Sequence, residues 1–120
     1  MDLKTAQEKI SQLNVSFTGE CPILYSMKII GSKWKVPILW QLMLEDGLHY
    51  NQLKRKVGNI TNTMLTKSLR ELEEAGLLTR KDYGTIPPSV SYHLTELGLN
   101  LVFTLEALFV WGQEHMKKQP

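Results

Sequence analysis

The chain has 120 residues, 42% of them apolar, and a formal net charge of +2, a composition typical of one folded domain with a single core. One cysteine excludes an internal disulfide, and three histidines without ligand spacing argue against a metal centre, so we expect no metal and no cofactor. No stretch approaches the roughly 20 apolar residues of a membrane span, and the N-terminus has no apolar signal core. We therefore expect a cytoplasmic protein with no membrane partner.

Positive charge gathers in the middle third of the chain. Residues 49–81 hold seven basic residues against three glutamates, a net charge of +4, whereas residues 1–48 are neutral overall and residues 82–120 carry a net charge of −2. Such clustering is the electrostatic footprint expected of nucleic-acid binding, although a charge run taken alone is more often a solvated face.

Two short helices are predicted at the start of the chain. An apolar stripe indicates an amphipathic helix over about residues 3–14, with Leu3 and Ile10 on the same face. The segment NVSFTGE, residues 14–20, breaks this pattern. Because proline is favoured at the first helical position, Pro22 predicts a second helix with Cys21 as its N-cap and an end at Gly31.

A third helix and a short extended segment are expected next. Ser32 is a candidate N-cap for the helix KWKVPILWQLML, in whose second turn Pro37 would permit a kink. The segment EDG ends this helix. The following LHY, residues 48–50, is too short to stand alone but could add a small strand to a sheet elsewhere.

Residues 50–76 carry the pattern of a helix-turn-helix. Asn51 would cap a helix of under two turns, QLKRKV, and a tight turn containing Gly58 would follow. Thr61 would then cap a longer helix, which Gly76 would end as a C-terminal glycine.

A wing and a last helix complete the predicted order. LLTRKDY and SVSYHL are rich in β-forming residues and partly alternating, and the turn-rich GTIPP joins them, so residues 77–94 predict a two-stranded wing. Thr95 would cap one long helix over about 95–116. The predicted fold class is mainly α with a small β-wing: one winged helix-turn-helix domain over residues 1–120, with extra N- and C-terminal dimerisation helices at about 3–14 and 95–116.

The helix after Thr61 has two different faces. At about 100° per residue, Leu69 and Leu72 fall within about 40° of Leu65, whereas the opposite face carries small hydroxyls and cations. Asn62 can offer an amide to a base edge and Arg70 a guanidinium fork. This arrangement is typical of a recognition helix that enters the major groove by its first turns. A wet amphipathic face explains the helix alone equally well, and the neighbouring short helix and wing favour DNA.

The chain resembles winged helix-turn-helix regulators of the HxlR type, which are relatives of the MarR group. The resemblance covers roughly residues 21–112 and rests on CPILYSMKIIGSKWKVPILWQL, HYNQLKRKVGNITNTMLTKSLRELEEAGLL and IPPSVSYHLTELG, in that order. It implies a cytoplasmic, dimeric, DNA-binding protein without catalytic activity. Family wings usually carry a basic residue and then an acid where this chain has Ser89 and Ser91, so we expect Lys81 or Arg80 to supply the wing's phosphate contact.

These patterns together predict a sequence-specific transcriptional regulator that acts as a homodimer on a palindromic operator in double-stranded DNA. A winged helix that docks on a protein without binding DNA is the alternative. An enzyme is not expected, because no phosphate loop, paired acids or metal set accompanies the single thiol. The predicted DNA-contacting residues are Asn51, Lys54, Thr61, Asn62, Thr63, Thr66, Lys67, Arg70, Arg80 and Lys81.

The last helix predicts a dimer interface, because its apolar residues cover an arc of roughly 240°. The stripe containing Leu101 and Leu105 should pack on the winged core, together with Leu97 and Leu108. The other stripe should meet a partner, with the first helix joining it. The expected interface residues are Leu3, Ile10, Leu99, Val102, Phe103, Phe109 and Val110.

Cys21 is a candidate redox or electrophile sensor. As an N-cap, its sulfur would lie beside free backbone N–H groups, a setting that favours the reactive thiolate. The resemblance adds that some family members sense thiol-reactive compounds through a cysteine at this Cys-Pro position, so a thiol-reactive or small-molecule effector is expected. A buried cysteine that acts as a small apolar residue is the alternative.

Overall fold

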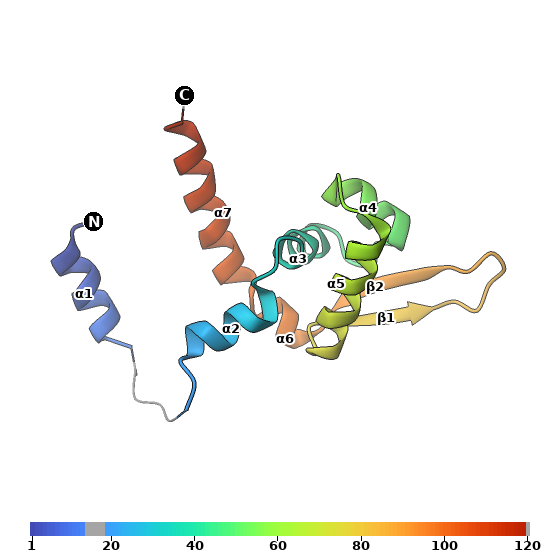
Figure 1. Ribbon diagram of the computed structural model, residues 1–120, viewed down its shortest axis with the longest axis horizontal. Coiled ribbons are helices and arrows are strands. Elements are labelled where there is room, and N and C mark those ends of the chain that lie inside the picture. The colour runs from blue at the N-terminus through green and yellow to red at the C-terminus, as the bar shows by residue number, and fades with distance from the viewer. Residues whose placement is uncertain (14–18, 120) are drawn as a thin grey trace.

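The computed structural model describes residues 1–13 and 19–119. Helix α1 lies apart from the other helices in Figure 1 and buries none of its residues, and the predicted break at 14–20 falls largely outside the described residues. The mainly helical fold with a two-stranded wing agrees with the predicted class. In chain order the elements are α1 (Leu3–Ser11), α2 (Pro22–Ile30), α3 (Lys35–Leu44), α4 (Tyr50–Val57), α5 (Asn62–Glu74), β1 (Leu78–Asp82), β2 (Val90–Leu94), α6 (Glu96–Leu99) and α7 (Val102–Lys117).

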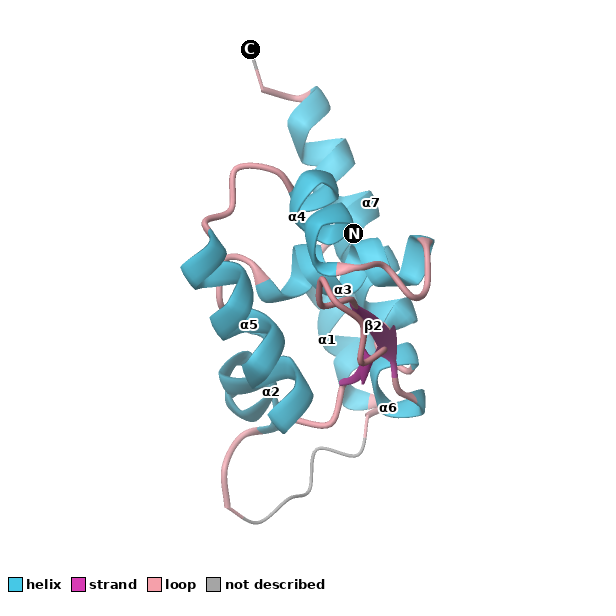
Figure 2. Cartoon of the chain, turned by 90° about the vertical axis from the view of Figure 1, so that its right-hand side faces the viewer, coloured by secondary structure: helices cyan, strands magenta, loops and turns pink. Residues whose placement is uncertain are grey.

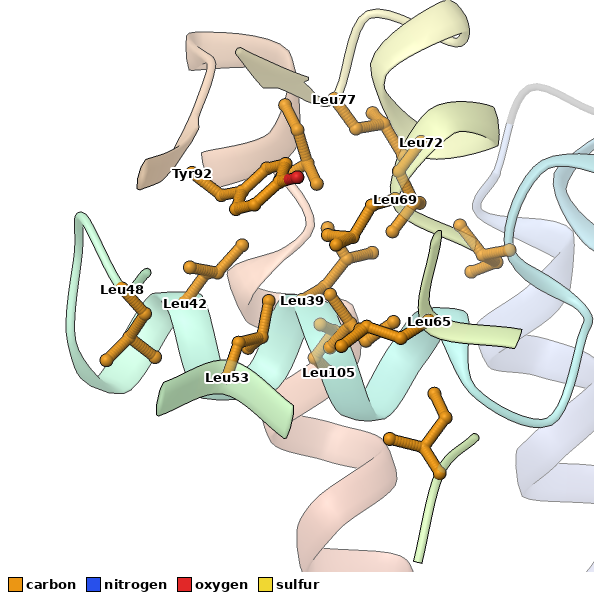
Figure 3. Packing of buried hydrophobic residues seen from close by; sticks show 14 residues of the cluster. Leu39, Leu42, Leu48, Leu53, Leu65, Leu69, Leu72, Leu77, Tyr92 and Leu105 are labelled. Atoms are coloured by element: carbon orange, nitrogen blue, oxygen red, sulfur yellow. The ribbon is translucent and has the colours of Figure 1, made fainter. Parts of the chain in front are cut away.

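Helix α3 lies at the centre of the packing and contacts α4, α5, α7 and β2. Its buried side chains, Leu39 and Leu42 among them, meet leucines from α4 and α5 and Tyr92 from β2 (Figure 3). Full burial of each such leucine contributes about 1.5–3 kcal/mol, so this one cluster fixes the helix-turn-helix against the wing. Figure 2 looks onto the side of the molecule that carries α4, α5 and the wing.

Helix α5 begins and ends where the sequence predicts. Thr61 Oγ1 accepts a hydrogen bond from the Met64 N–H at 3.1 Å. At the other end Gly76 adopts φ +80°, and the Leu77 N–H donates to the Leu72 carbonyl at 3.0 Å. These bonds satisfy backbone groups that the helix ends would leave without partners, and they orient α5 toward the wing.

Two predicted caps are wrong. Helix α3 begins at Lys35, after Trp34 and not after Ser32, so Pro37 lies in the first turn, where a missing N–H removes no helical hydrogen bond and no kink is required. Helix α4 begins two residues early, at Tyr50, with His49 in place of Asn51 as its N-cap. The Gln52 side chain accepts the His49 N–H at 2.9 Å and so closes this end of the helix.

The single helix expected over 95–116 is two helices, α6 and α7. Thr95 caps α6 as predicted, with its Oγ1 accepting from the Gly98 N–H at 3.1 Å, but the chain turns before Val102. A Cβ on Gly98 would lie 2.4 Å from the Leu77 main-chain oxygen, so only glycine lets α6 pack this closely on the start of the wing.

The predicted core stripe of the last helix packs only in part. Within α7, all of which the structure describes, Leu105 is the buried residue. Leu101, just before α7, is half-buried, whereas Leu97 and Leu108 are more than half exposed. Beyond Leu105, α7 stays largely exposed although Phe109 contacts Trp40 of α3, so its apolar surface extends further than the sequence predicts.

The wing is a two-stranded antiparallel sheet in which Arg80 lies opposite Tyr92 and Lys81 lies opposite Ser91. The LHY segment joins it through a single bridge between His49 and Ser91, and the Tyr92 N–H donates to the Leu48 carbonyl at 3.0 Å. The small additional strand suggested by the sequence is therefore one bridge, which ties the wing to the start of α4.

Candidate nucleic-acid interface

Helix α5 has the two faces that its periodicity predicts. Leu65, Leu69 and Leu72 are at most 2% exposed. The polar side chains of the other face are exposed and line one shallow hollow on the surface; they are Asn62, Thr63, Thr66, Lys67 and Arg70. The structure thus brings the predicted hydroxyls, amide and cations together on one surface of the helix.

Both cations on this face stay available to a ligand. Lys67 and Arg70 each have a glutamate one turn later, with an N–O distance of 4.0 Å in both pairs, and their side chains are 57% and 63% exposed. Ion pairs this exposed contribute about 0–1 kcal/mol, so a phosphate or a base edge can replace the glutamate at small cost.

A buried lysine beneath α5 was not predicted. Lys35 of α3 is 7% exposed, and its Nζ lies 2.8 Å from Oε2 of Glu71. The hydrogen bond from Lys35 holds the pKa of the Glu71 carboxyl below its usual value. This pairing partly neutralises an acid beside the exposed cations. The sequence signal for this ion pair is a lysine within an apolar run. Such a lysine is expected to be buried, and a buried ammonium needs a charged or hydrogen-bonding partner.

The sequence also gave no signal for the position of Tyr50. Its side chain leaves the first turn of α4 and reaches α5, where its Oη lies 3.0 Å from Oγ1 of Thr66 and 3.1 Å from the Asn62 main-chain oxygen. The side chain of Thr66 and the main chain of Asn62 are therefore attached to the preceding helix.

The remaining predicted contacts of the helix-turn-helix lie on α4 and at the cap of α5. Asn51 and Lys54 line a second hollow together with Gly58 and Asn59. Asn51 is exposed and Lys54 is half-buried. The Thr61 side chain is exposed, with its hydroxyl engaged in the cap of α5.

The two basic residues predicted for the wing lie on opposite faces of the sheet. Arg80 borders a cleft between α5 and the wing, which Tyr92 and Arg70 also line. Burial raises the pKa of the Tyr92 phenol, and Arg80 opposes that shift. Lys81 points to the other face, with its Nζ 4.9 Å from the centre of the Tyr83 ring. Only Arg80 thus shares a cleft with the outer face of α5.

Hydroxyl–imidazole contacts occupy the wing positions where the chain departs from the family pattern. Ser89 Oγ lies 3.1 Å from Nδ1 of His49, and Ser91 Oγ lies 2.8 Å from Nε2 of His93. Asp46 Oδ2 lies 3.1 Å from Nδ1 of the same His93. Neutral serines here anchor the wing to the residues before α4 and carry no charge for DNA.

The predicted dimer residues remain open to solvent. Phe103 is 79% exposed and Leu3 is 73% exposed. Phe109 is half exposed and stacks on Trp40, with ring centres 4.9 Å apart. The others range from half-buried to more than half exposed; they are Ile10, Leu99, Val102 and Val110.

Cys21 is the N-cap residue of α2, as predicted, and is half-buried. Its side chain makes no capping hydrogen bond. The contact between the sulfur and the backbone N–H groups, which the sequence argument for a reactive thiolate assumed, is therefore not formed.

Neither a metal cluster nor a membrane-crossing helix occurs in the part of the chain that the structure describes. No group of three His, Cys, Asp or Glu side chains within residues 1–13 and 19–119 could hold an ion. No described helix is both long and apolar enough to span a bilayer.

Comparisons with known proteins agree with this geometry. A family model described as HxlR-like helix-turn-helix matches residues 29–120. MalR of Fusobacterium mortiferum, named as a regulatory protein, is 44% identical over 96 residues, which are 80% of this chain and 91% of that protein.

Two solved structures extend the likeness to the fold. The HTH-type transcriptional regulator ytcD superposes with a TM-score of 0.76 at 38% identity, over 82% of this chain and 100% of that one. The redox regulator HypR in its oxidized form superposes with a TM-score of 0.72 at 36% identity, over 78% and 96%. This chain therefore belongs to the HxlR-like helix-turn-helix family of transcriptional regulators.

Proposed function

We propose that the protein binds a palindromic operator in double-stranded DNA as a homodimer, with α5 in the major groove. The outer face of α5 carries this proposal, because exposed hydroxyls, an amide and two weakly paired cations share one surface. Such groups suit base edges and phosphates. The pairing of Lys35 with Glu71 supports it further by reducing the negative charge beside that surface.

The flanking elements suit contacts with the DNA backbone. Asn51 and Lys54 of α4 line the hollow beside the turn before α5, and Arg80 borders the cleft between α5 and the wing. In this proposal these residues contact phosphates on either side of the groove, and Lys81, on the far face of the wing, contributes only to the general positive field.

The homodimer rests on the apolar surface of α7. Phe103 on α7 and Leu99 at the end of α6 are more than half exposed, and a helix with such a surface is stabilised when a partner covers it. The amphipathic α1 adds Leu3 and Ile10. Two-fold symmetry would set two α5 helices about one turn of DNA apart, which is the spacing that a palindromic operator requires.

Selection of bound sequences from random duplexes, followed by binding measurements at several salt concentrations, tests this proposal. Lys67→Ala should weaken binding to all sequences alike and lower the salt slope by about one, whereas Arg70→Ala should cost about 1–3 kcal/mol and relax the preference at one base pair. Lys117→Ala is the matched control, because this exposed cation on α7 is also paired with a glutamate one turn away.

The double variant Lys67→Ala, Arg70→Ala can refute the placement of α5 in the major groove. If it stays folded and binds the operator as the native chain does, α5 is not the reading helix. If the native chain binds no duplex but retains a protein partner, the docking-module alternative is correct.

We also propose that Cys21 senses oxidants or electrophiles. Its thiol is partly accessible, and HypR, a similar protein, is described as a redox regulator. With one cysteine per chain, diamide would accept two electrons and two protons as two Cys21 thiols join in an intersubunit disulfide, or as one Cys21 thiol and a small thiol join in a mixed disulfide. A quinone would instead form an adduct, in which the Cys21 sulfur bonds to a ring carbon and the thiol proton passes to the reduced quinone.

Operator affinity with and without diamide, for the native chain and for Cys21→Ser, tests the sensor. The native chain should change its affinity on treatment, and the serine variant should not. Equal responses of the two proteins, or an inert Cys21 in the folded native chain, would contradict this role.

A further inference from the structure

The phenol of Tyr50 joins the hydrophobic core to the outer face of α5. Its Oη lies 3.1 Å from the main-chain oxygen of Asn62, 3.4 Å from Oδ1 of the same residue and 3.0 Å from Oγ1 of Thr66. The Tyr50 ring is half-buried and packs against the core, whereas Asn62 and Thr66 are exposed. A side chain outside the recognition helix thus contacts two groups proposed to face DNA.

The number of protons at this contact decides the direction of each hydrogen bond. A phenol has one O–H, and a main-chain oxygen can only accept. The phenol of Tyr50 therefore donates to Asn62, and the contact with Thr66 is a hydrogen bond only if the threonine donates to the phenol oxygen. Any other assignment leaves two oxygens facing each other at about 3 Å without a proton.

This arrangement commits the hydroxyl proton of Thr66 to Tyr50. The remaining lone pairs of Oγ1 can then accept from a partner outside the protein, but the group has no proton to offer. In the major groove the amino groups of adenine and cytosine are donors, whereas O6 of guanine and O4 of thymine are acceptors. Thr66 therefore discriminates between bases with an amino group and bases with a carbonyl oxygen only while it donates its hydroxyl proton to Tyr50.

We propose that Tyr50 is a positioning residue that fixes Thr66 as a hydrogen-bond acceptor and so makes it select an adenine or cytosine amino group. The inference rests on the proposed binding of DNA by α5. It goes beyond that proposal because the base preference at one pair is set by a hydroxyl on α4 that does not itself touch DNA.

Sequence selection with four proteins tests the inference: the native chain, Thr66→Val, Tyr50→Phe and Tyr83→Phe. Thr66→Val locates the base pair, which must be one where the native chain prefers adenine or cytosine on the contacted strand. Tyr50→Phe should reduce that preference by about fivefold, the effect of about one hydrogen bond, with the other positions and the salt slope unchanged. Tyr83→Phe is the matched control, because it removes a phenol that contacts a serine hydroxyl in the wing.

Several results would overturn the inference. One is a Thr66→Val variant that loses a preference for guanine or thymine. Another is a folded Tyr50→Phe variant whose base preferences equal those of the native chain, or weaken uniformly at every position. A fifth protein, the double variant Tyr50→Phe, Thr66→Val, should have the same base preferences as Thr66→Val alone, because Tyr50 acts through Thr66. A further loss of preference in this double variant would also contradict the inference. A native chain that selects no sequence would instead refute DNA reading by α5, and the two failures are therefore distinguishable.

Discussion

Truncation of Phe103 is the sharpest test of the proposed dimer. The side chain is 79% exposed on α7, so nearly all of its burial would come from a partner. Full burial of a phenylalanine contributes about 1.5–3 kcal/mol, which gives about 1.2–2.4 kcal/mol for the surface still exposed. Because a two-fold dimer buries two copies, Phe103→Ala should weaken association by about 2.4–4.8 kcal/mol, or about 60- to 3,000-fold in the dissociation constant.

Sedimentation equilibrium over a range of micromolar concentrations measures this dissociation constant. Urea unfolding under conditions where the protein is monomeric measures the stability of the single chain, which Phe103→Ala should leave nearly unchanged. Leu105→Ala is the matched control, because this neighbour on α7 is 2% exposed. Its removal should cost about 2–5 kcal/mol of unfolding free energy through a cavity.

Two results would refute this reasoning about α7. One is a native chain that stays monomeric at micromolar concentration. The other is a dimer whose dissociation constant does not respond to Phe103→Ala, since the partner would then cover a different surface.

Two further predictions concern the packing that positions α5. The pKa of Glu71 is lowered from 4.5 in the folded state, so its carboxylate contributes stability above that pH, and the contribution is lost as the pH falls through the lower folded pKa. At neutral pH the free energy of unfolding should therefore be higher for the native chain than for Glu71→Gln, and this difference should disappear in acid. A difference that stays constant with pH would show that the ion pair with Lys35 does not cause it. Gly98→Ala should lower the free energy of unfolding by about 1–3 kcal/mol through overpacking against Leu77, whereas Gly112→Ala, with nothing near the added methyl, should stabilise; a neutral Gly98→Ala would show that α6 can move away.

Local chemistry in the sequence is sufficient to predict α5 and the wing. The period of the leucines, the hydroxyl of Thr61 and the left-handed conformation at Gly76 act within a few residues of each other. The same holds for the β-forming residues of β1 and β2, with the turn-rich GTIPP between them. The predicted exposed face of α5 follows from this period, because a buried stripe leaves the opposite side chains outside.

The misplaced boundaries have tertiary causes. Helix α4 begins at Tyr50 because its cap involves Gln52 and the bridge from His49 to the wing. The last helix divides because Gly98 packs against the main chain of Leu77, some twenty residues earlier. Helical periodicity contains no information about either contact, because it describes the faces of one segment and not the elements that cover them.

The sequence by itself determined which side chains α5 turns outward, since 3.6 residues per turn and three leucines decide that orientation. Only the tertiary structure decided how those side chains are held. Lys35 reaches Glu71 from a different helix, and Tyr50 reaches Asn62 and Thr66 across the turn. Contacts between segments depend on the distances and angles at which helices pack, and these are fixed by the whole core rather than by the pattern of any one segment.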